Sequence, residues 1–185
     1  MLLDFTPRLY QQTILATAAR KNTLVVLPTG LGKTAIAFML AAQRLQMYPQ
    51  SKILLLAPTK PLAEQHLHTF QKHLSIEKEK YALFTGAVSP EKRAELWTDA
   101  QVIIGTPQGI ENDVLGDKLD LTHVSLLVLD EAHHATGDYS YCFIAQQYLK
   151  KAGFSRILGL TASPGSDAEK IKEVCKNLYI EAVEI

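Results

Sequence analysis

The stretch Thr23-Leu24-Val25-Val26-Leu27-Pro28-Thr29-Gly30-Leu31-Gly32-Lys33-Thr34 decides the fold of this chain. Residues 23–27 form a short, largely apolar run that is typical of a buried strand, and a helical pattern of apolar residues starts near Lys33. A glycine-rich turn between a strand and a helix lets backbone N–H groups and the positive end of the helix dipole point at phosphate oxygens. The stretch therefore predicts a phosphate-binding loop.

Each part of this loop has an expected task. Gly30 and Gly32 allow the tight backbone path. Lys33 places a positive charge toward the outer phosphates of a nucleotide, and Thr34 offers its hydroxyl to magnesium. The remaining expected members of the nucleotide-binding set are Pro28, Thr29 and Leu31. Leu27 stands where the longer GxxxxGKT pattern has its first glycine, so the match is to a shorter form; the alternative is a glycine-rich helix start with an incidental lysine.

Length and composition fit one globular domain. The chain has 185 residues, 47% of them apolar, with 19 basic and 19 acidic side chains. A net charge of zero excludes a polycation that grips nucleic acid everywhere, so any site for a polyanion must be local. The spacing of Cys142 and Cys175 indicates neither a zinc ribbon nor a disulfide framework, and we therefore expect a reducing compartment. Without a signal-type segment or a membrane span, we expect a cytoplasmic protein without a membrane partner.

Short apolar runs alternate along the chain with stretches in which apolar residues recur every three or four positions. The short runs predict strands at 23–27, 52–57, 81–84, 101–105, 125–130, 156–160 and 179–184. The longer stretches predict helices at 10–19, 33–46, 61–73, 90–97, 141–151 and 167–178, with a loop-rich surface connection at 105–123. Continuously apolar strands are buried on both faces, so we expect an α/β fold with a mostly parallel sheet of about seven strands flanked by helices.

A second motif follows the strand expected at 125–130, in the residues Leu126-Leu127-Val128-Leu129-Asp130-Glu131-Ala132-His133. The strand delivers Asp130 to the carboxyl edge of the sheet, where open α/β sheets bind their ligands. There Asp130 is expected to hold magnesium, together with Thr34, and Glu131 to orient the water that attacks the γ-phosphate. An acidic turn after a strand is the simpler alternative.

With the later Leu160-Thr161-Ala162-Ser163-Pro164, these two segments resemble motifs I, II and III of superfamily 2 helicases, in the same order. The resemblance implies that residues 1–185 form a single RecA-like, DEAH-box, P-loop domain that uses ATP and Mg. It implies a catalytic set of Lys33, Asp130, Glu131 and His133, with His133 as an interaction residue between motifs. It also implies that Thr161 and Ser163 couple the nucleotide state to domain movement, although strand-end capping would explain both hydroxyls.

Four shorter segments resemble further motifs of this family. Arg8-Leu9-Tyr10-Gln11 is similar to the Q-type motif, which implies that Gln11, helped by Arg8, reads adenine. The nucleic-acid-binding segments that the resemblance implies contain Thr59, Lys60, Thr85, Gly86 and Thr106. Such hydroxyls and backbone N–H groups bind phosphates without reading base sequence. Ordinary turns are the alternative for these pairs. Lys60 and Arg93 are candidates for an added salt-dependent contact, with a solvated face as the alternative for Arg93.

Histidines at 66, 68 and 73 fall on one expected helix, but their spacing cannot place three ligands around one zinc ion. We therefore expect no structural metal.

The amino-acid sequence from Asp130 to Tyr141 and around Thr161 is most similar to that of the Hef and Fanconi-anaemia M branch of DNA helicases. This implies a full-length motor that remodels forked or branched DNA through backbone contacts. A helicase for double-stranded RNA and a stand-alone nucleotide-switched binding module stay open as alternatives. No motif VI is present in these residues, so we expect the second RecA-like domain to lie elsewhere in the protein and the isolated domain to hydrolyse little ATP. The oligomeric state is left open.

Overall fold

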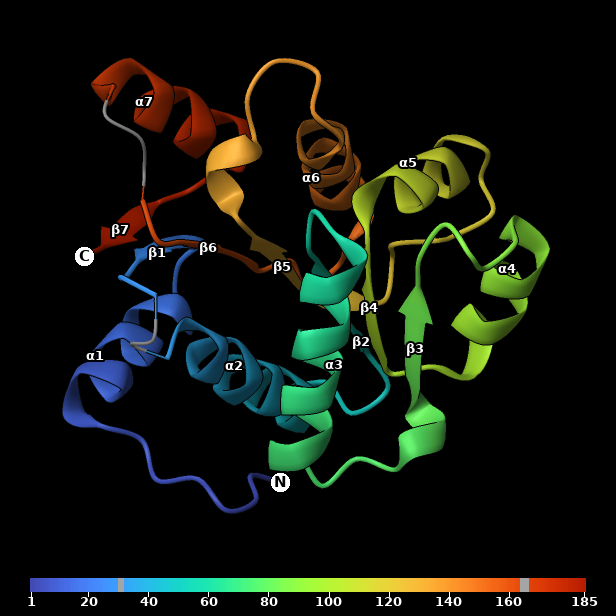
Figure 1. Cartoon of the computed structure of the whole chain (residues 1–185), viewed down its shortest axis with the longest axis horizontal. Coiled ribbons are helices and arrows are strands. Elements are labelled where there is room, and N and C mark those ends of the chain that lie inside the picture. Colours follow the sequence, from blue (N-terminus) through green and yellow to red (C-terminus); the bar gives the residue numbers. More distant parts are fainter. Residues whose placement is uncertain (30–31, 164–166) are drawn as a thin grey trace.

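The structure is a computed structural model that describes residues 1–29, 32–163 and 167–185. Its centre is a seven-stranded sheet (Figure 1). The strands are β1 (Thr23–Val26), β2 (Lys52–Leu56), β3 (Tyr81–Phe84), β4 (Val102–Gly105), β5 (Val124–Asp130), β6 (Ile157–Thr161) and β7 (Ala182–Glu184). All pairings are parallel, and the strands lie in the order β3-β4-β2-β5-β6-β1-β7. The carboxyl ends of the strands therefore meet at one edge.

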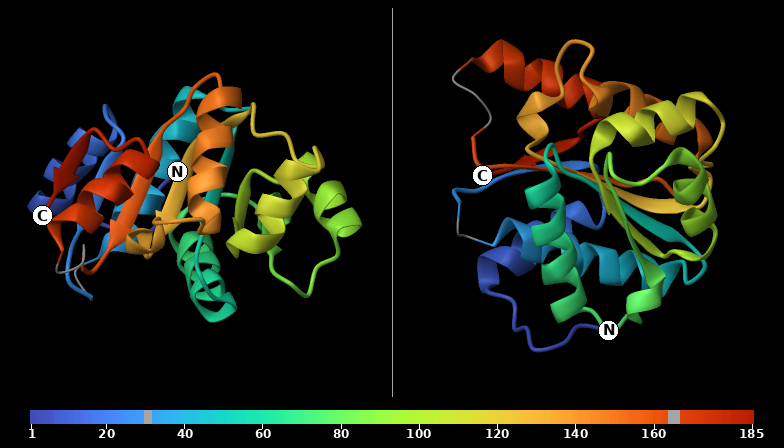
Figure 2. Two further views of the ribbon diagram at one scale, coloured as in Figure 1. Left: turned by 90° about the horizontal axis from the view of Figure 1, so that it is seen from above. Right: turned by 45° about the vertical axis from the view of Figure 1, so that its right-hand side comes forward.

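Helices cover both faces of the sheet (Figures 1 and 2). The α-helices are α1 (Leu9–Ala18), α2 (Lys33–Met47), α3 (Lys60–His73), α4 (Pro90–Asp99), α5 (Pro107–Leu115), α6 (Ser140–Lys151) and α7 (Ala168–Asn177). Two short 3-10 helices, η1 (Lys78–Lys80) and η2 (Ala132–His134), complete the described elements. One apolar core lies between the sheet and α1, α2 and α3, and a second lies between the sheet and α4 to α7. The expected α/β class is confirmed.

The apolar runs predict the strands well because the sheet is covered on both sides. Every residue of β1, β4, β5 and β6 is buried. The largest difference is at β7, which the sequence predicts from residue 179 and which begins at Ala182. Tyr179 has a φ of 56° and its N–H donates to Lys176 O at 3.3 Å, so this residue closes α7 before the strand can start.

The prediction of a loop-rich connection at residues 105–123 is wrong, because α5 occupies its first half. Thr106 stands at the N-cap and Pro107 at the first helical position, where a missing N–H costs nothing. Pro107, Ile110 and Asp113 are buried on one side of the helix. Gly109 suggests a loop in the sequence, but a Cβ there would lie 3.2 Å from the Arg93 guanidinium carbon, so the glycine makes room for that side chain.

Trp97, the single tryptophan of the chain, lies on α4 at the β3 end of the sheet. Trp97 is 7% exposed, and the centroid of its ring lies 6.4 Å from that of Phe84 and 5.5 Å from the Lys52 ammonium. The aromatic rings of Trp97 and Phe84 therefore pack α4 against β3. Among the described helices, none is both long and apolar enough to cross a membrane.

Candidate nucleotide and nucleic-acid site

The phosphate loop connects β1 to α2, as the sequence predicts. Gly32 is the N-cap of α2 and has a φ of +79°, a left-handed conformation that favours glycine. Pro28 and Thr29 are exposed, and Thr34 lies in the first turn of α2. Gly30 and Leu31, which belong to the predicted set, lie outside the described residues.

Lys33 turns back toward its own loop. Its Nζ donates a hydrogen bond to the carbonyl oxygen of Leu27 at 2.9 Å. The ammonium therefore lies at the end of β1, beside the backbone that the loop starts from. Its contact with the outer phosphates of a nucleotide stays a prediction.

Gln11 of α1 lies directly against the phosphate loop. A Cβ placed on Gly32 would come within 2.5 Å of Gln11 Nε2, and Gln11 is only 4% exposed. Its Oε1 accepts from the backbone N–H of Arg8 at 2.9 Å, while the Arg8 side chain is exposed. The fold thus brings the Q-type motif and motif I together. Reading of adenine by these two residues stays a prediction.

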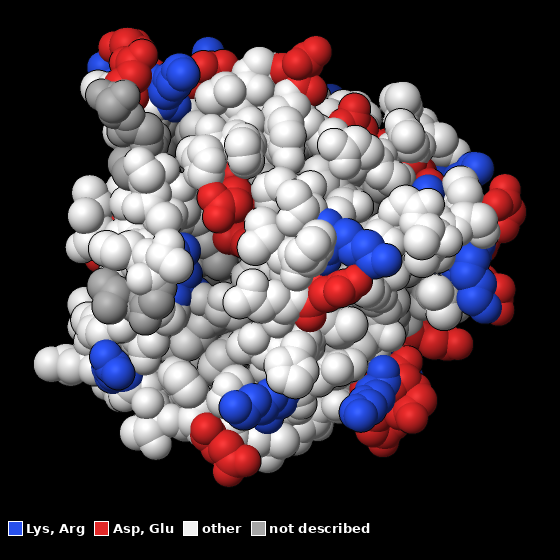
Figure 3. Space-filling model, in the orientation of Figure 1, with Lys and Arg blue, Asp and Glu red and all other residues white. Residues whose placement is uncertain are grey.

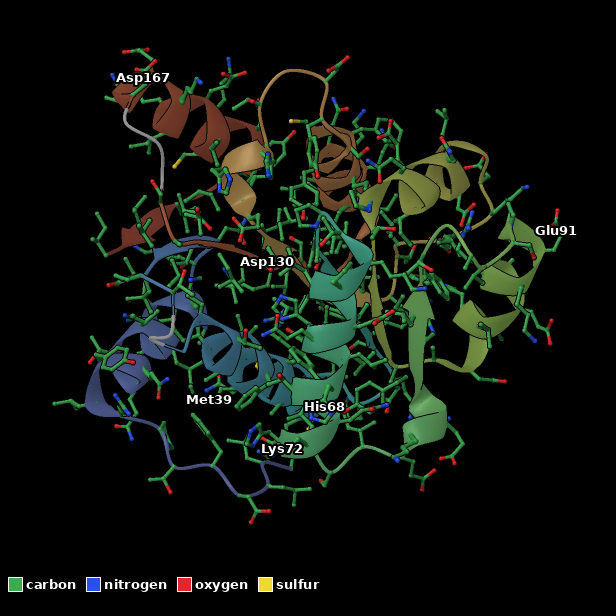
Figure 4. All side chains as sticks on the ribbon, in the orientation of Figure 1. Met39, His68, Lys72, Glu91, Asp130 and Asp167 are labelled. Atoms are coloured by element: carbon green, nitrogen blue, oxygen red, sulfur yellow. The ribbon has the colours of Figure 1, made fainter. Side chains whose placement is uncertain are left out.

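Asp130 is the last residue of β5, at the same edge of the sheet (Figure 4), and Glu131 follows it in the chain. Asp130 is 6% exposed, and its Oδ1 accepts from the backbone N–H of Glu131 at 2.9 Å. Glu131 has a φ of 50° and a ψ of 49°, which is strained for a residue with a side chain. The Glu131 carboxylate is partly exposed and lies 3.5 Å from His133 Nδ1. Its role in orienting a water molecule stays a prediction.

β6 lies between the two motifs and touches both. In the sheet order it separates β5, which carries Asp130, from β1, which leads into the phosphate loop. The carbonyl of Thr161 accepts from the N–H of Leu27 at 3.1 Å, and its Oγ1 lies 2.9 Å from His133 Nδ1. The same hydroxyl donates to Ser163 O and accepts from Ser163 N–H, so a strand-end turn is present as well. Its coupling role stays a prediction.

His133 is tied to the end of β6. Its Nδ1 shares a hydrogen bond with the Thr161 hydroxyl, which also contacts Ser163 O. Burial, followed by the neighbouring His134, lowers the pKa of His133, while Glu131 and Asp130 oppose this shift. The ring is therefore neutral near pH 7. A neutral ring held by motif III fits an interaction residue between motifs.

The donors at this edge suit magnesium. Thr34 offers a hydroxyl and Asp130 a carboxylate, and hard oxygen ligands of this kind are the ones that Mg²⁺ takes in nucleotide sites. Asp130 ends β5, and Thr34 lies in the first turn of the helix that follows β1, with β6 between these two strands. Thr34 and Asp130 would hold the hydrated ion, and the ion would neutralise phosphate charge.

The predicted nucleic-acid-binding residues follow β2, β3 and β4 at the same edge. Thr59 caps α3, its Oγ1 accepting from Leu62 N–H at 3.4 Å, and Lys60 is exposed beside Glu64. Thr85 is buried, and its Oγ1 accepts from Ala87 N–H at 3.4 Å. Thr85 therefore shapes its turn more than it faces solvent. Gly86 is exposed, and Thr106 is half-buried at the start of α5. Their contacts with nucleic acid stay predictions.

Neither interpretation of Arg93, a nucleic-acid contact or a solvated face, is correct. Arg93 is 5% exposed, and its Nη2 donates to Asp113 Oδ1 at 2.9 Å while Nε donates to Oδ2. Its Nη1 donates to Val88 O, in the segment that follows Gly86. Hydrogen bonding to Asp113 raises the pKa of Arg93. The guanidinium is thus a buried tie between α4, α5 and the loop after β3.

The surface charge agrees with local rather than general anion binding. On the face shown in Figure 3, the described Lys and Arg side chains are scattered among acidic ones and form no continuous basic strip. Contacts with a polyanion on this face would therefore rest mainly on hydroxyls and backbone N–H groups.

Two side chains that the sequence analysis did not assign lie against motif II. His66 Nε2 is 2.7 Å from Asp130 Oδ2, and both side chains are buried. The Tyr141 hydroxyl donates to Leu56 O at 3.1 Å and to Asp130 O at 2.7 Å, and burial raises the pKa of Tyr141. The sequence carries no spacing signal for the contacts of His66 with Asp130 and of Tyr141 with Leu56, because they join residues 64 and 85 positions apart. Tyr141 and Asp130 are 11 positions apart, at the two ends of the segment whose resemblance is described above.

A parallel sheet with a strand–glycine loop–helix unit and an acidic strand end at one edge defines a phosphate-loop nucleotide-binding domain. Residues 8–171 match the DEAD/DEAH box helicase family, and the chain belongs to it. The chain is 50% identical to the helicase domain of Hef from Pyrococcus furiosus, with a TM-score of 0.95; the match covers 100% of this chain and 40% of the other.

Two curated relatives match over 96% of this chain. One, from Methanocaldococcus jannaschii, is named as an ATP-dependent RNA helicase and is 49% identical over 178 residues. The other, from Drosophila melanogaster, is the DEAD-box ATP-dependent DNA helicase Fancm and is 42% identical over 182 residues. The chain spans 22% of the first relative and 12% of the second. It is therefore similar to one domain of proteins that are much longer.

Proposed function

We propose that these residues are the ATP-binding first motor domain of a helicase that remodels forked or branched DNA. The observation that carries the proposal is the meeting of the phosphate loop and Asp130–Glu131 on either side of Thr161, at a sheet edge that also carries Thr59 and Thr106. A nucleotide and a nucleic-acid backbone would then bind along one edge of one sheet. Similarity to the Hef helicase domain and to Fancm supports the choice of DNA.

In this proposal ATP and magnesium are the cofactors. Gly32, Lys33 and Thr34 would bind the phosphates and the ion, and Gln11 with Arg8 would face the base. Glu131 would accept a proton from the attacking water, while Asp130 would hold the hydrated ion. A second RecA-like domain of the same protein would supply the positive charge that stabilises the transition state.

The test is ATP hydrolysis by the full-length protein with no nucleic acid, with forked DNA and with linear duplex DNA. We expect the strongest stimulation by the fork. The Glu131→Gln variant is the matched control for a contaminating ATPase. A full-length protein whose hydrolysis does not respond to any nucleic acid would contradict the motor and support the binding-module alternative.

The RNA helicase name of the Methanocaldococcus relative favours one competing substrate. Hydroxyl and backbone contacts to phosphates do not by themselves separate DNA from RNA. Duplex RNA of the same length therefore belongs in the assay. Stronger stimulation by duplex RNA than by forked DNA would replace the proposed substrate and leave the motor proposal intact.

A further inference from the structure

His66 links the helix that starts at the predicted nucleic-acid contacts to the carboxylate of Asp130. Its Nε2 lies 2.7 Å from Asp130 Oδ2, and each residue is 6% exposed. A carboxylate oxygen accepts hydrogen bonds, so Nε2 carries the hydrogen of this contact. The N–H of Glu131 occupies the other oxygen at 2.9 Å. Together these two donors fix the plane of the carboxylate.

The position of His66 on α3 makes the contact part of a rigid unit. Ala63, His66 and Phe70 are the buried residues of α3, spaced so that they share the face that packs on the sheet. Thr59 caps the helix, and His66 follows seven residues later, about 10 Å along the axis. Figure 4 shows Asp130 near the N-terminal end of α3 and His68 further along this helix. A shift at the start of α3 therefore carries His66 with it.

The other ring nitrogen argues against a purely packing role. Nδ1 is buried and has no hydrogen-bond partner within the described part of the chain. A buried polar atom without a partner costs stability, and an apolar side chain at this position would avoid that cost. Compared with an apolar side chain, a histidine at position 66 adds the hydrogen bond to Asp130.

We propose that His66 is a positioning residue that holds the Asp130 carboxylate for magnesium and transmits nucleic-acid binding at Thr59–Lys60 to it through α3. The inference rests on the proposed function, because it uses the expected tasks of these residues. With the N–H of His66 on Oδ2 and the N–H of Glu131 on Oδ1, the remaining lone pairs of the carboxylate would be left to hold the hydrated ion. Nucleic acid on the N-terminus of α3 would set this geometry.

The experiment uses the full-length protein with His66→Leu, which removes the donor and keeps an apolar volume. His66→Gln is the conservative variant, because its amide N–H reaches about as far as Nε2, and His66→Asn carries the same group on a shorter side chain. His68→Leu is the matched control, since His68 is exposed on the same helix. Two quantities are measured: the Mg²⁺ dependence of fluorescent ATP-analogue binding, and the stimulation of hydrolysis by forked DNA.

We expect His66→Leu and His66→Asn to need several-fold more Mg²⁺ for half-maximal nucleotide binding and to lose most of the DNA stimulation. Their affinity for DNA should stay within about twofold of the wild type, because His66 is buried. His66→Gln should recover most of both losses. If His66→Leu fails to fold, the difference between His66→Gln and His66→Asn in Mg²⁺ dependence and DNA stimulation still tests the proposal.

Unchanged Mg²⁺ dependence in both His66→Leu and His66→Asn would overturn the positioning role. Normal stimulation in these variants would overturn the coupling. A wild type that is not stimulated by any nucleic acid would contradict the proposed function and the coupling together, whereas the Mg²⁺ dependence would still test the positioning of Asp130. The two failures are therefore distinguishable.

Discussion

At the scale of single residues, Gly32 is under two independent constraints. Its φ of +79° strains any residue with a Cβ by about 1–2 kcal/mol, and that Cβ would meet Gln11 Nε2 at 2.5 Å. We predict that Gly32→Ala lowers nucleotide affinity by about tenfold or more, measured by equilibrium binding of a fluorescent ATP analogue. Gly153→Ala is the control, because nothing lies within 4 Å of its added Cβ. Equal affinity in both variants would contradict the prediction.

Glu131 should separate hydrolysis from binding. Glu131 follows the end of β5 in a strained conformation, and within the described part of the chain the one ionic contact of its carboxylate is a 3.5 Å approach to His133 Nδ1. We predict that Glu131→Gln lowers the hydrolysis rate of the full-length protein by about 10²–10⁴ and leaves nucleotide affinity nearly unchanged. Single-turnover kinetics and equilibrium binding check the two halves. Glu95→Gln, on an exposed face of α4, should change neither quantity.

Single residues were predictable where a motif is contiguous and unpredictable where the fold assembles a contact. The phosphate loop and the Asp130–Glu131 pair each occupy one short segment that carries its own spacing. His66 lies 64 positions from Asp130, so no pattern along the chain joins them. Arg93 resembles a surface base in sequence, because its buried partner Asp113 is contributed by a helix that was not predicted.

At the scale of secondary-structure elements, the Arg93–Asp113 pair joins α4 to α5 behind two predicted nucleic-acid-binding loops. Removing one partner leaves the other charge buried and unpaired. We predict that Arg93→Ala lowers the free energy of unfolding by about 3–5 kcal/mol, measured by urea denaturation. The variant should also bind nucleic acid more weakly, since Val88 O loses a donor and the loop after β3 loses its anchor.

The control for this variant is the neighbouring residue. Lys92 carries the same charge on the same helix, but it is exposed, and its ion pair in the described part of the chain is with the exposed Glu95. Lys92→Ala should change the free energy of unfolding by less than about 0.5 kcal/mol. Equal stability in the two variants would mean that the buried pair does not hold α4 and α5 together.

Helices and strands were predictable from the sequence where their buried residues form a regular apolar pattern. The five central strands are covered on both faces and are continuously apolar, so their bounds were predicted to within about one residue. The edge strands β3 and β7 are partly exposed, and the predicted start of β7 was too early. α5 was missed because Gly109, Asn112 and Asp113 reduce its helical pattern. Tertiary contacts explain why two of these residues occur in a helix. Gly109 leaves room for the Arg93 guanidinium, and Asp113 binds it.

At the scale of the whole molecule, the proposal that a second domain completes the site has a direct measurement. We predict that residues 1–185 alone bind an ATP analogue but hydrolyse ATP about 10³–10⁵ times more slowly than the full-length protein with DNA. An arginine finger accounts for that range in related phosphoryl transfer. Thermal denaturation with and without nucleotide would check that the isolated residues are folded.

Robust DNA-stimulated hydrolysis by residues 1–185 would contradict this prediction and show that the site is complete. The Lys33→Ala variant of the same residues serves as the control for specific binding. Its ammonium contacts only the carbonyl of Leu27 among the described hydrogen bonds, so the substitution should leave the fold intact and remove nucleotide binding.

The order of the strands in the sheet could not be predicted from the sequence. The alternation of strands and helices indicates a parallel sheet, but it does not say that β6 separates β5 from β1. That order arises from how seven apolar strands and the helices between them share two cores. It also decides that Thr161, and not a residue next to motif I in sequence, contacts both loops.

The position of Trp97 gives the molecule one native optical reporter. The single indole lies at the β3 end of the sheet, five strand positions and about 24 Å from β1, where the phosphate loop begins. Its emission therefore reports the packing of α4 next to the loop after β3, with no label attached. If nucleotide alone changes that emission, a structural change at the phosphate loop has been transmitted across most of the sheet to α4.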